Sequence, residues 1–287
     1  MIVPTSDGWR LGVSVHLASG PRRGVVVALP AMMVDARSLD RPAGHGLAST
    51  LARSGFEVWR ADFRGHGASP PLAHAGGRWT YDDLVRRDVP ALVDAARAAG
   101  GPVMVLGHSL GAHVSAAAAA EGVPIDALVL LAANVWMPSL EPSTRRRAQK
   151  AAMMEAFGAV AQLRGRFPSR RLGWGPADES LGYVRDLVRF WREDAWRARD
   201  GTDWSAGLAR FGGRVLAVAG AGDALLAHPE SARRFTDPFP SGAVDFWVAG
   251  RPRLGWDPDH AGLACDARSA PLWGEIAAWL TQVGSEG

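Results

Sequence analysis

The sequence predicts an α/β fold with a mostly parallel central sheet flanked by helices. Short apolar runs rich in Val, Leu and Ala alternate along the chain with segments of helical pattern. This alternation is typical of parallel strands joined by crossover helices that cover both faces of a sheet. The segment 9–17 is expected to add an antiparallel strand at one edge. The runs that predict the parallel strands lie at 24–29, 57–61, 103–106, 127–132, 215–219 and 244–249.

An insertion interrupts this alternation in the second half of the chain. About 80 residues separate the run at 127–132 from the run at 215–219, far more than a crossover helix requires. Helical patterns cover 143–163 and 181–196, with Pro168 and the turn at 173–176 between them. We therefore expect a core formed by 1–134 and 208–287 and a helical insertion at 135–207. Its many Trp, Phe and Met side chains predict an apolar roof.

Composition limits the classes of function. The chain has 287 residues, of which 47% are hydrophobic, so it can form one large domain with a buried core. A formal charge of +3 gives no strong reason to expect a nucleic-acid partner. The single cysteine, Cys265, excludes an intramolecular disulfide. No metal-ligand cluster or phosphate-binding loop is evident, so we expect no metal and no cofactor.

Localisation is predicted from segments that the sequence lacks. No uninterrupted apolar stretch reaches the roughly 20 residues needed to span a bilayer, so membrane insertion is not expected. The amino-terminal residues contain no basic segment followed by a long apolar one. These features predict a cytoplasmic protein, and they leave its oligomeric state open.

The most informative motif is the pentapeptide Gly107-His108-Ser109-Leu110-Gly111. It lies directly between the apolar run at 103–106 and a small-residue helical segment at 112–120. A strand that enters a helix through one residue forces that residue into a strained turn, and flanking glycines allow the two backbones to cross. This context predicts a nucleophile elbow that exposes the hydroxyl of Ser109.

A serine nucleophile requires a base, and the base requires an orienting acid. Asp223 follows the apolar run at 215–219 and two glycines, so we expect it at the carboxyl end of a strand. A structural alternative for Asp223 is the N-cap of the next helix. His260 lies in a loop after the last predicted strand and is the favoured base; His66 is its competitor. The order Ser109, Asp223, His260 is typical of a nucleophile-elbow fold.

Together these motifs resemble the α/β-hydrolase superfamily, in particular its lipase, esterase and serine aminopeptidase-like branch. The segment from Asp62 to Ser69 resembles the Asp-x-Arg-Gly-x-Gly-x-Ser loop of that family, and His260 with the final helix resembles its catalytic histidine region. In that loop we expect Asp62, Arg64 and His66 to stabilise the turn through hydrogen bonds. The resemblance also implies that the insertion forms a cap over the elbow, with a substrate cleft beneath it.

One loop departs from the family pattern. Family members usually carry His-Gly after the strand at 24–29, whereas this chain reads Pro30-Ala31-Met32-Met33. The resemblance implies that the backbone amides of Met32 and Leu110 form the oxyanion hole, and any residue except proline supplies such an amide. We expect Met33, His108, Trp136 and Met137 to contact the substrate.

These features predict a serine hydrolase that cleaves a small-molecule carboxylic ester with an apolar acyl or alcohol moiety through an acyl-enzyme. Thioester hydrolysis or acyl transfer would use the same intermediate and remains open. An aminopeptidase is less favoured, because no acidic cluster in the insertion is evidently placed to bind a free amine. The contrasting alternative is a non-catalytic ligand-binding protein with the same fold.

Overall fold

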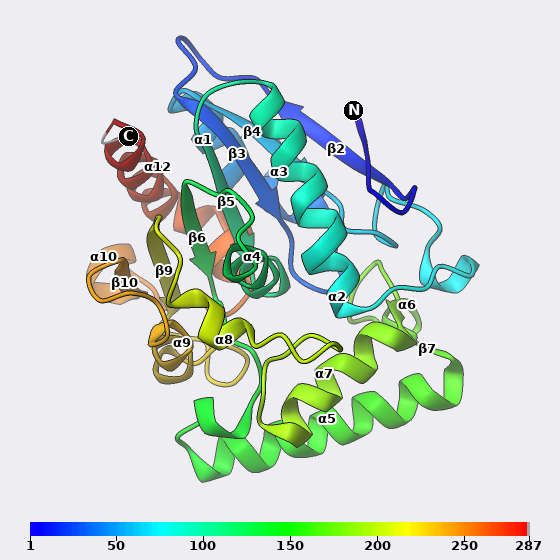
Figure 1. The fold of residues 1–287 in the computed structure, drawn as a ribbon. Helices are drawn as coiled ribbons and strands as arrows, with labels where there is room; N and C mark the ends of the chain where they lie inside the picture. Colours follow the sequence, from blue (N-terminus) through cyan, green and yellow to red (C-terminus); the bar gives the residue numbers. More distant parts are fainter. Residues whose placement is uncertain (286–287) are drawn as a thin grey trace.

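A single mixed sheet carries the fold of the computed structural model, which describes residues 1–285 (Figure 1). Within these residues, eight strands form this sheet in the order β1-β2-β4-β3-β5-β6-β9-β10. The first two strands are antiparallel to their neighbours, and the other six run parallel to one another. The predicted α/β fold with an antiparallel edge is confirmed. The strands are β1 (Ile2–Pro4), β2 (Arg10–His16), β3 (Gly24–Leu29), β4 (Phe56–Ala61), β5 (Val103–His108), β6 (Ala127–Leu131), β9 (Arg214–Gly220) and β10 (Val244–Ala249).

Two hydrophobic cores lie on the two faces of the sheet. In β3, Val25 and Val27 belong to one core, whereas Val26 and Ala28 belong to the other, as the alternation of side chains along a strand requires. Because both faces are covered, every residue of β3, β5 and β6 is buried. The first core is covered by α3 (Val89–Ala98) and α4 (Leu110–Ala120), and the second by α1 (Leu47–Arg53), α11 (Gly262–Cys265) and α12 (Ala270–Ser285).

Short helices connect these elements. Thr80 caps the turn α2 with its hydroxyl, and the Asp83 carboxylate bonds back to the Thr80 amide, so that both ends of this capping box are satisfied. The turn continues through η3 into α3 without a break. The connecting helices are η1 (Ala36–Asp40), η2 (Ala73–Ala75), α2 (Tyr81–Asp83), η3 (Leu84–Asp88), α9 (Pro229–Thr236), α10 (Arg251–Leu254) and η5 (Ala267–Ser269).

Helices dominate the long segment between β6 and β9. The long helices α5 and α7 contact each other and lie at the end of the sheet toward which β6 points (Figure 1). They extend close to the predicted ranges, and the glycine at 165 ends α5 in a left-handed conformation. The boundaries predicted for an insertion at 135 and 207 stay a prediction. The elements are η4 (Pro138–Leu140), α5 (Thr144–Arg164), β7 (Arg166–Phe167), α6 (Ser169–Leu172), β8 (Glu179–Ser180), α7 (Leu181–Glu193) and α8 (Trp204–Leu208).

Hydrogen bonds join this segment to the rest of the fold at several places, among them Ser180 and Trp204. The Ser180 hydroxyl accepts from the Trp79 amide at 3.0 Å and donates to the Trp79 carbonyl at 2.8 Å. Near the carboxyl-terminal end of the segment, the Trp204 indole donates to the Glu121 carboxylate at 2.6 Å. These bonds cross from the insertion to elements that pack on the sheet, so they fix its position beside the strand ends.

The close approach of α4 to β3 yields a first prediction. A Cβ atom at Gly111 would lie 2.4 Å from the backbone oxygen of Leu29, whereas a Cβ at Gly274 in α12 would meet no atom within 4 Å. We expect Gly111→Ala to lower the free energy of unfolding by about 1–3 kcal/mol, because a backbone clash outweighs the gain in helix propensity. Gly274→Ala is expected to raise it by about 0.5–1 kcal/mol. Urea denaturation measures both, and equal effects of the two substitutions would contradict the prediction.

Candidate active site

Ser109 occupies the turn between β5 and α4. Its backbone adopts φ 53° and ψ −109°, a conformation that is rare for a residue with a side chain, and its amide donates to the Leu131 carbonyl at 2.8 Å. A Cβ at Gly107 would lie 2.2 Å from the Ala112 nitrogen, so the preceding position requires glycine as well. The local structure is therefore the strained turn that the motif predicts, with Ser109 at the carboxyl end of β5.

Asp223 lies in the turn after β9 and is held by backbone amides. Its carboxylate accepts from the amides of Leu225 and Leu226 through Oδ1, and from the amide of Ala227 through Oδ2. Burial would raise the pKa of Asp223, but the hydrogen bond and charge of His260 and these amides lower it below its ordinary value. Asp223 is not the N-cap of the next helix, because α9 begins at Pro229 and its N-cap is His228. Its carboxylate instead stabilises the turn at 225–227 and also binds His260.

His260 lies between the serine and the aspartate. Its Nε2 is 2.8 Å from Ser109 Oγ, and its Nδ1 is 2.7 Å from Asp223 Oδ2. A carboxylate only accepts hydrogen bonds, so Nδ1 carries a proton, and Nε2 of the neutral ring then accepts from the Ser109 hydroxyl. The structure thus brings together all three side chains predicted to form the catalytic triad.

The loops that carry Asp223 and His260 pack backbone against backbone. The Gly222 amide donates to the Pro258 carbonyl at 3.0 Å, and a Cβ at Gly220 would lie 2.3 Å from the same oxygen. Glycine at the end of β9 therefore allows the two loops to approach. This backbone contact holds the loops of Asp223 and His260 close enough for their side chains to hydrogen-bond.

His108 lies behind the base. Its Nε2 donates to the His260 carbonyl at 2.8 Å, and its side chain is buried. Burial, with a smaller effect of His260, lowers the pKa of His108 to about 3, so the ring is neutral and carries its proton on Nε2. The sequence predicted a substrate contact for His108, whereas its observed polar contact holds the backbone of the catalytic-base candidate.

The loop at 30–33 lies beside the start of α4. The Gly111 amide donates to the Pro30 carbonyl at 3.1 Å, which fixes the loop to the elbow. Among residues 1–285, no group accepts a hydrogen bond from the amides of Met32 and Leu110, the two predicted oxyanion donors. Met33 is buried with φ 63°, and its amide donates to Glu179 Oε1 at 2.6 Å. The backbone amide of Met33 is thus bound by a residue of the insertion.

Trp136 and Met137, the other predicted substrate contacts, begin the insertion. The Trp136 indole donates to the Leu226 carbonyl at 2.9 Å, and the ammonium of Lys150 lies 5.3 Å from the centre of its ring. Lys150 itself is buried and pairs with Glu141 at 2.9 Å. Trp136 therefore anchors the turn that contains Asp223. Met137 is buried in the core that also contains Met33 and Leu110, and its contact with substrate stays a prediction.

The loop that carries Asp62, Arg64 and His66 is held by the hydrogen bonds that the sequence predicts. Asp62 accepts from the amides of Ala36 and Ala68, at 2.7 and 2.8 Å. The buried Arg64 guanidinium binds the Asp88 carboxylate at 2.7 Å. His66 is buried and pairs with Glu179 at 3.1 Å, whereas the hydroxyl of Ser109 is bound by His260, so His66 does not compete with His260.

Sequence reasoning missed two groups near the site. Glu179 reaches Met33 and His66 across 146 and 113 residues, and no local pattern indicates such pairings. His113, one turn after Ser109, lies 2.7 Å from the Tyr81 hydroxyl through Nδ1, and the Trp196 indole donates to the same hydroxyl at 3.1 Å. Burial lowers the pKa of His113 to about 3, so this ring is neutral.

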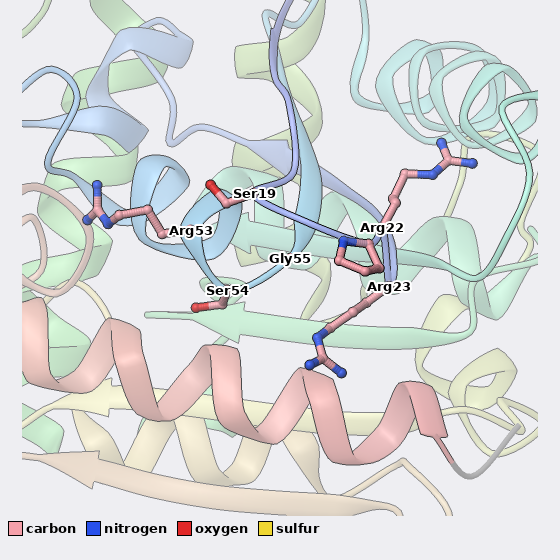
Figure 2. A pocket seen from close by; sticks show the side chains of 7 residues that line it. Ser19, Arg22, Arg23, Arg53, Ser54 and Gly55 are labelled. Carbon is pink, nitrogen blue, oxygen red and sulfur yellow. The ribbon is translucent and has the colours of Figure 1, made fainter.

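A basic depression lies far from these residues. It has a volume of about 450 Å³ and is lined mainly by Ser19, Arg22, Arg23, Arg53 and Ser54 (Figure 2). Gly24 and Phe56 begin β3 and β4 beside it, whereas the Ser109 turn follows the opposite end of β5.

Within the described part of the chain, no group of His, Cys, Asp and Glu could hold a metal ion, and no helix is long and apolar enough to cross a membrane.

The α/β-hydrolase class is defined by a serine at a strand-to-helix turn in a mostly parallel sheet. An acid and then a histidine follow along the chain and lie at the same end of that sheet. The family model described as serine aminopeptidase, S33, matches residues 21–204. The chain belongs to this family, as the sequence motifs indicated. Triacylglycerol lipase 2 of Arabidopsis thaliana is 28% identical over 206 residues, which are 65% of this chain and 46% of that protein. The chain thus spans about half the length of this curated relative.

Solved structures of the same class share the fold over nearly the whole chain. A soluble variant of monoglyceride lipase from Saccharomyces cerevisiae aligns with a TM-score of 0.69 at 17% identity, covering 99% of this chain and 96% of that one. A thermophilic esterase from Thermogutta terrifontis aligns with a TM-score of 0.66 at 16% identity, covering 99% and 98%. These structures show that the chain has the α/β-hydrolase fold.

The short contact between His260 and Asp223 yields a spectroscopic prediction. A proton held between Nδ1 and a carboxylate at 2.7 Å should give a low-field proton NMR resonance in the native protein. Asp223→Asn should remove this resonance or shift it upfield, because a neutral amide is a weaker acceptor. Asp259→Asn is the matched control, since Asp259 binds the Gly262 amide and not the His260 ring. A resonance unchanged in Asp223→Asn would contradict the geometry.

Proposed function

We propose that this protein hydrolyses carboxylic esters of small molecules through an acyl-enzyme on Ser109. One observation carries this proposal: the imidazole of His260 joins Ser109 Oγ at 2.8 Å to Asp223 Oδ2 at 2.7 Å. The two ring nitrogens have different partners, so the ring is oriented and its tautomer is fixed. No cofactor is needed for this chemistry.

Acylation begins with attack of Ser109 Oγ on the ester carbonyl carbon. His260 Nε2 takes the hydroxyl proton as the new C–O bond forms, and the Asp223 carboxylate stabilises the resulting imidazolium. When the tetrahedral intermediate collapses, the bond to the leaving alcohol breaks and His260 delivers the proton to its oxygen. The products of this half-reaction are the free alcohol and an acyl group on Ser109.

Deacylation repeats these steps with water as the nucleophile. His260 removes a proton from the water, the hydroxide attacks the acyl carbonyl, and the proton returns to Ser109 Oγ as the carboxylic acid leaves. An alcohol, amine or thiol in place of water would give acyl transfer with the same residues. The intermediate is common to both outcomes, so hydrolysis is the proposal and transfer is its alternative.

The backbone amides of Met32 and Leu110 are the proposed donors to the oxyanion. They lie on the two loops that flank the nucleophile, and no group within residues 1–285 occupies them. Donors that are oriented in advance stabilise the negative charge that develops on the carbonyl oxygen, and each typically contributes a factor of about 100 to 1,000 in turnover.

The insertion favours an ester over an amino-terminal peptide as substrate. A free substrate amine would need an unengaged carboxylate near the site, but the insertion carboxylates already have partners. Asp178 binds Arg166, Glu179 binds the Met33 amide and His66, and Asp186 binds Arg199 and the Tyr81 amide. The other six also have partners: Glu141 binds Lys150, Glu155 binds Arg192, Glu193 binds Arg189, Asp194 binds the Ser139 amide, Asp200 binds Arg86 and Asp203 binds Arg197.

An apolar acyl or alcohol moiety fits the surroundings of the site. Met33, Leu110 and Met137 belong to one hydrophobic core, which continues into the aromatic side chains of α5 and α7. Apolar groups of a substrate placed next to these side chains would be removed from water, which favours binding.

Active-site labelling tests the proposal. Incubation with a fluorophosphonate should add one adduct to the intact protein, and Ser109→Ala and His260→Ala should abolish it, because the adduct requires an activated serine. The same two substitutions should lower kcat for p-nitrophenyl butyrate by about 10⁴-fold or more. Ser19→Ala, at an exposed serine near the other end of the sheet, should change neither result.

The variants must first show native circular dichroism and cooperative unfolding. A folded parent protein that forms no adduct and hydrolyses no ester would refute the proposal and favour the ligand-binding alternative. An adduct that persists in Ser109→Ala would place the nucleophile elsewhere. A mixture of esters and acyl acceptors, with products measured by mass spectrometry, distinguishes hydrolysis from transfer.

A further inference from the structure

Met33, the residue after the proposed oxyanion donor Met32, is bound by the insertion through both of its backbone polar groups. Its amide donates to Glu179 Oε1 at 2.6 Å, and its carbonyl accepts from the Ala177 amide at 3.0 Å. A Cβ at Gly175 would lie 2.3 Å from the Met33 carbonyl oxygen, so the insertion backbone passes directly against this loop. The left-handed φ of 63° at Met33 is thus maintained from outside the loop.

Glu179 is a buried carboxylate with a buried histidine as its partner. Neither Glu179 nor His66 exposes more than 1% of its surface, and the His66 Nε2 lies 3.1 Å from Glu179 Oε1. Glu179 is placed by pairing of β8 with β7, where it lies opposite Phe167. This pairing fixes the backbone from which the carboxylate reaches the loop.

The hydrogen bonds of His66 determine its charge. Nδ1 lies 3.0 Å from the Arg64 carbonyl, and Nε2 faces the Glu179 carboxylate; both partners are acceptors. Both ring nitrogens must then carry a proton, which makes His66 an imidazolium. Burial alone would lower the pKa of His66, but the charge and hydrogen bond of Glu179 outweigh it and raise the pKa, with smaller contributions from the Arg64 carbonyl and Asp62.

We propose that Glu179 and His66 form a positioning pair for the oxyanion hole: the carboxylate fixes the Met33 amide and thereby orients the Met32 amide, while the imidazolium cancels the carboxylate's charge. This inference rests on the proposed function. A lone carboxylate beside the oxyanion hole would oppose the negative charge that develops there, and in a buried site such repulsion is poorly screened. The pair provides the acceptor that the loop requires at no net charge.

The pair also accounts for the departure of the loop from the family pattern. Pro30, Ala31, Met32 and Met33 carry no side chain that can donate a hydrogen bond, and the only possible acceptors are the weak thioether sulfurs of the methionines. The polar contacts that hold the Met33 backbone come instead from Glu179 and the Ala177 amide. The insertion is thus part of the apparatus that shapes the oxyanion hole.

Steady-state kinetics with p-nitrophenyl butyrate tests this role. Glu179→Ala should lower kcat about 10- to 100-fold with little change in KM, because a misdirected donor affects the transition state more than substrate binding. Glu179→Gln should retain kcat within a few-fold, because its amide oxygen still accepts from the Met33 amide. Asp178→Asn is the matched control, since Asp178 is the adjacent buried insertion carboxylate and binds Arg166 and the Arg170 amide. Its kcat should equal that of the parent.

A double variant isolates the effect of charge. His66→Gln leaves the carboxylate without its cation and should lower kcat, whereas Glu179→Gln combined with His66→Gln should recover most of the loss. If the pair only stabilised the fold, variants with equal unfolding midpoints would have equal kcat. The double variant would then show no recovery of kcat over His66→Gln. The low-field resonance of His260 should be unchanged throughout, which separates this effect from damage to the triad.

The outcomes separate the two hypotheses. If the parent protein neither labels nor hydrolyses esters, the proposed function fails, and the positioning role fails with it. If the parent is active and Glu179→Ala keeps its kcat, or Glu179→Gln is as impaired as Glu179→Ala, the positioning role alone is refuted. Should Glu179→Ala fail to fold, the comparison of Glu179→Gln, His66→Gln and their double variant decides the question.

Discussion

The connection of β5 to α4 through a single residue is the constraint on which the site depends. It forces Ser109 to φ 53°, and the glycines at 107 and 111 are required because β5, α4 and β3 pass within contact of one another. The same closeness places the Gly111 amide on the Pro30 carbonyl, so the turn that presents the serine also locates the loop of Met32. The strain at one residue is sustained by a sheet whose central strands are completely buried.

Two buried carboxylates, Asp223 and Glu179, accept from backbone amides, and they differ in what balances their charge. Asp223 is surrounded by amides of its own turn and by His260, whose charge changes in the proposed reaction. Glu179 is bound to an amide of a different segment and to His66, whose charge is fixed by two acceptors. In the proposed reaction, proton transfer would change the charge beside Asp223, whereas the charge beside Glu179 would stay balanced.

The sequence was informative wherever the relevant physics is local. The strand and helix around Ser109, the turn after β9 and the loop before His260 were each visible as a short pattern of apolar residues, glycines and one polar side chain. The turn-stabilising role predicted for Asp62 is local in part, since its carboxylate accepts from the Ala68 amide of the same loop, whereas Arg64 binds Asp88, 24 residues away.

Contacts between distant segments escaped prediction. His108 binds the His260 backbone, Trp136 binds the Leu226 carbonyl, and Glu179 binds Met33; each pairing joins segments at least 90 residues apart. The tertiary fold, rather than periodicity, selects such partners. The sequence therefore indicated which residues are polar and near the site, but not whether they face substrate, backbone or one another.

The buried pair of Lys150 and Glu141 has a further consequence for the surface of the protein. Lys150 is the one lysine of the sequence, and its ammonium is enclosed by Glu141 and the Trp136 ring. The cationic side chains that stay exposed are therefore guanidinium groups, which remain protonated and are poor nucleophiles at neutral pH. Reagents and modifying enzymes that act on lysine side chains would find no accessible target on the native fold. Modification of Lys150 would therefore indicate that the insertion had opened.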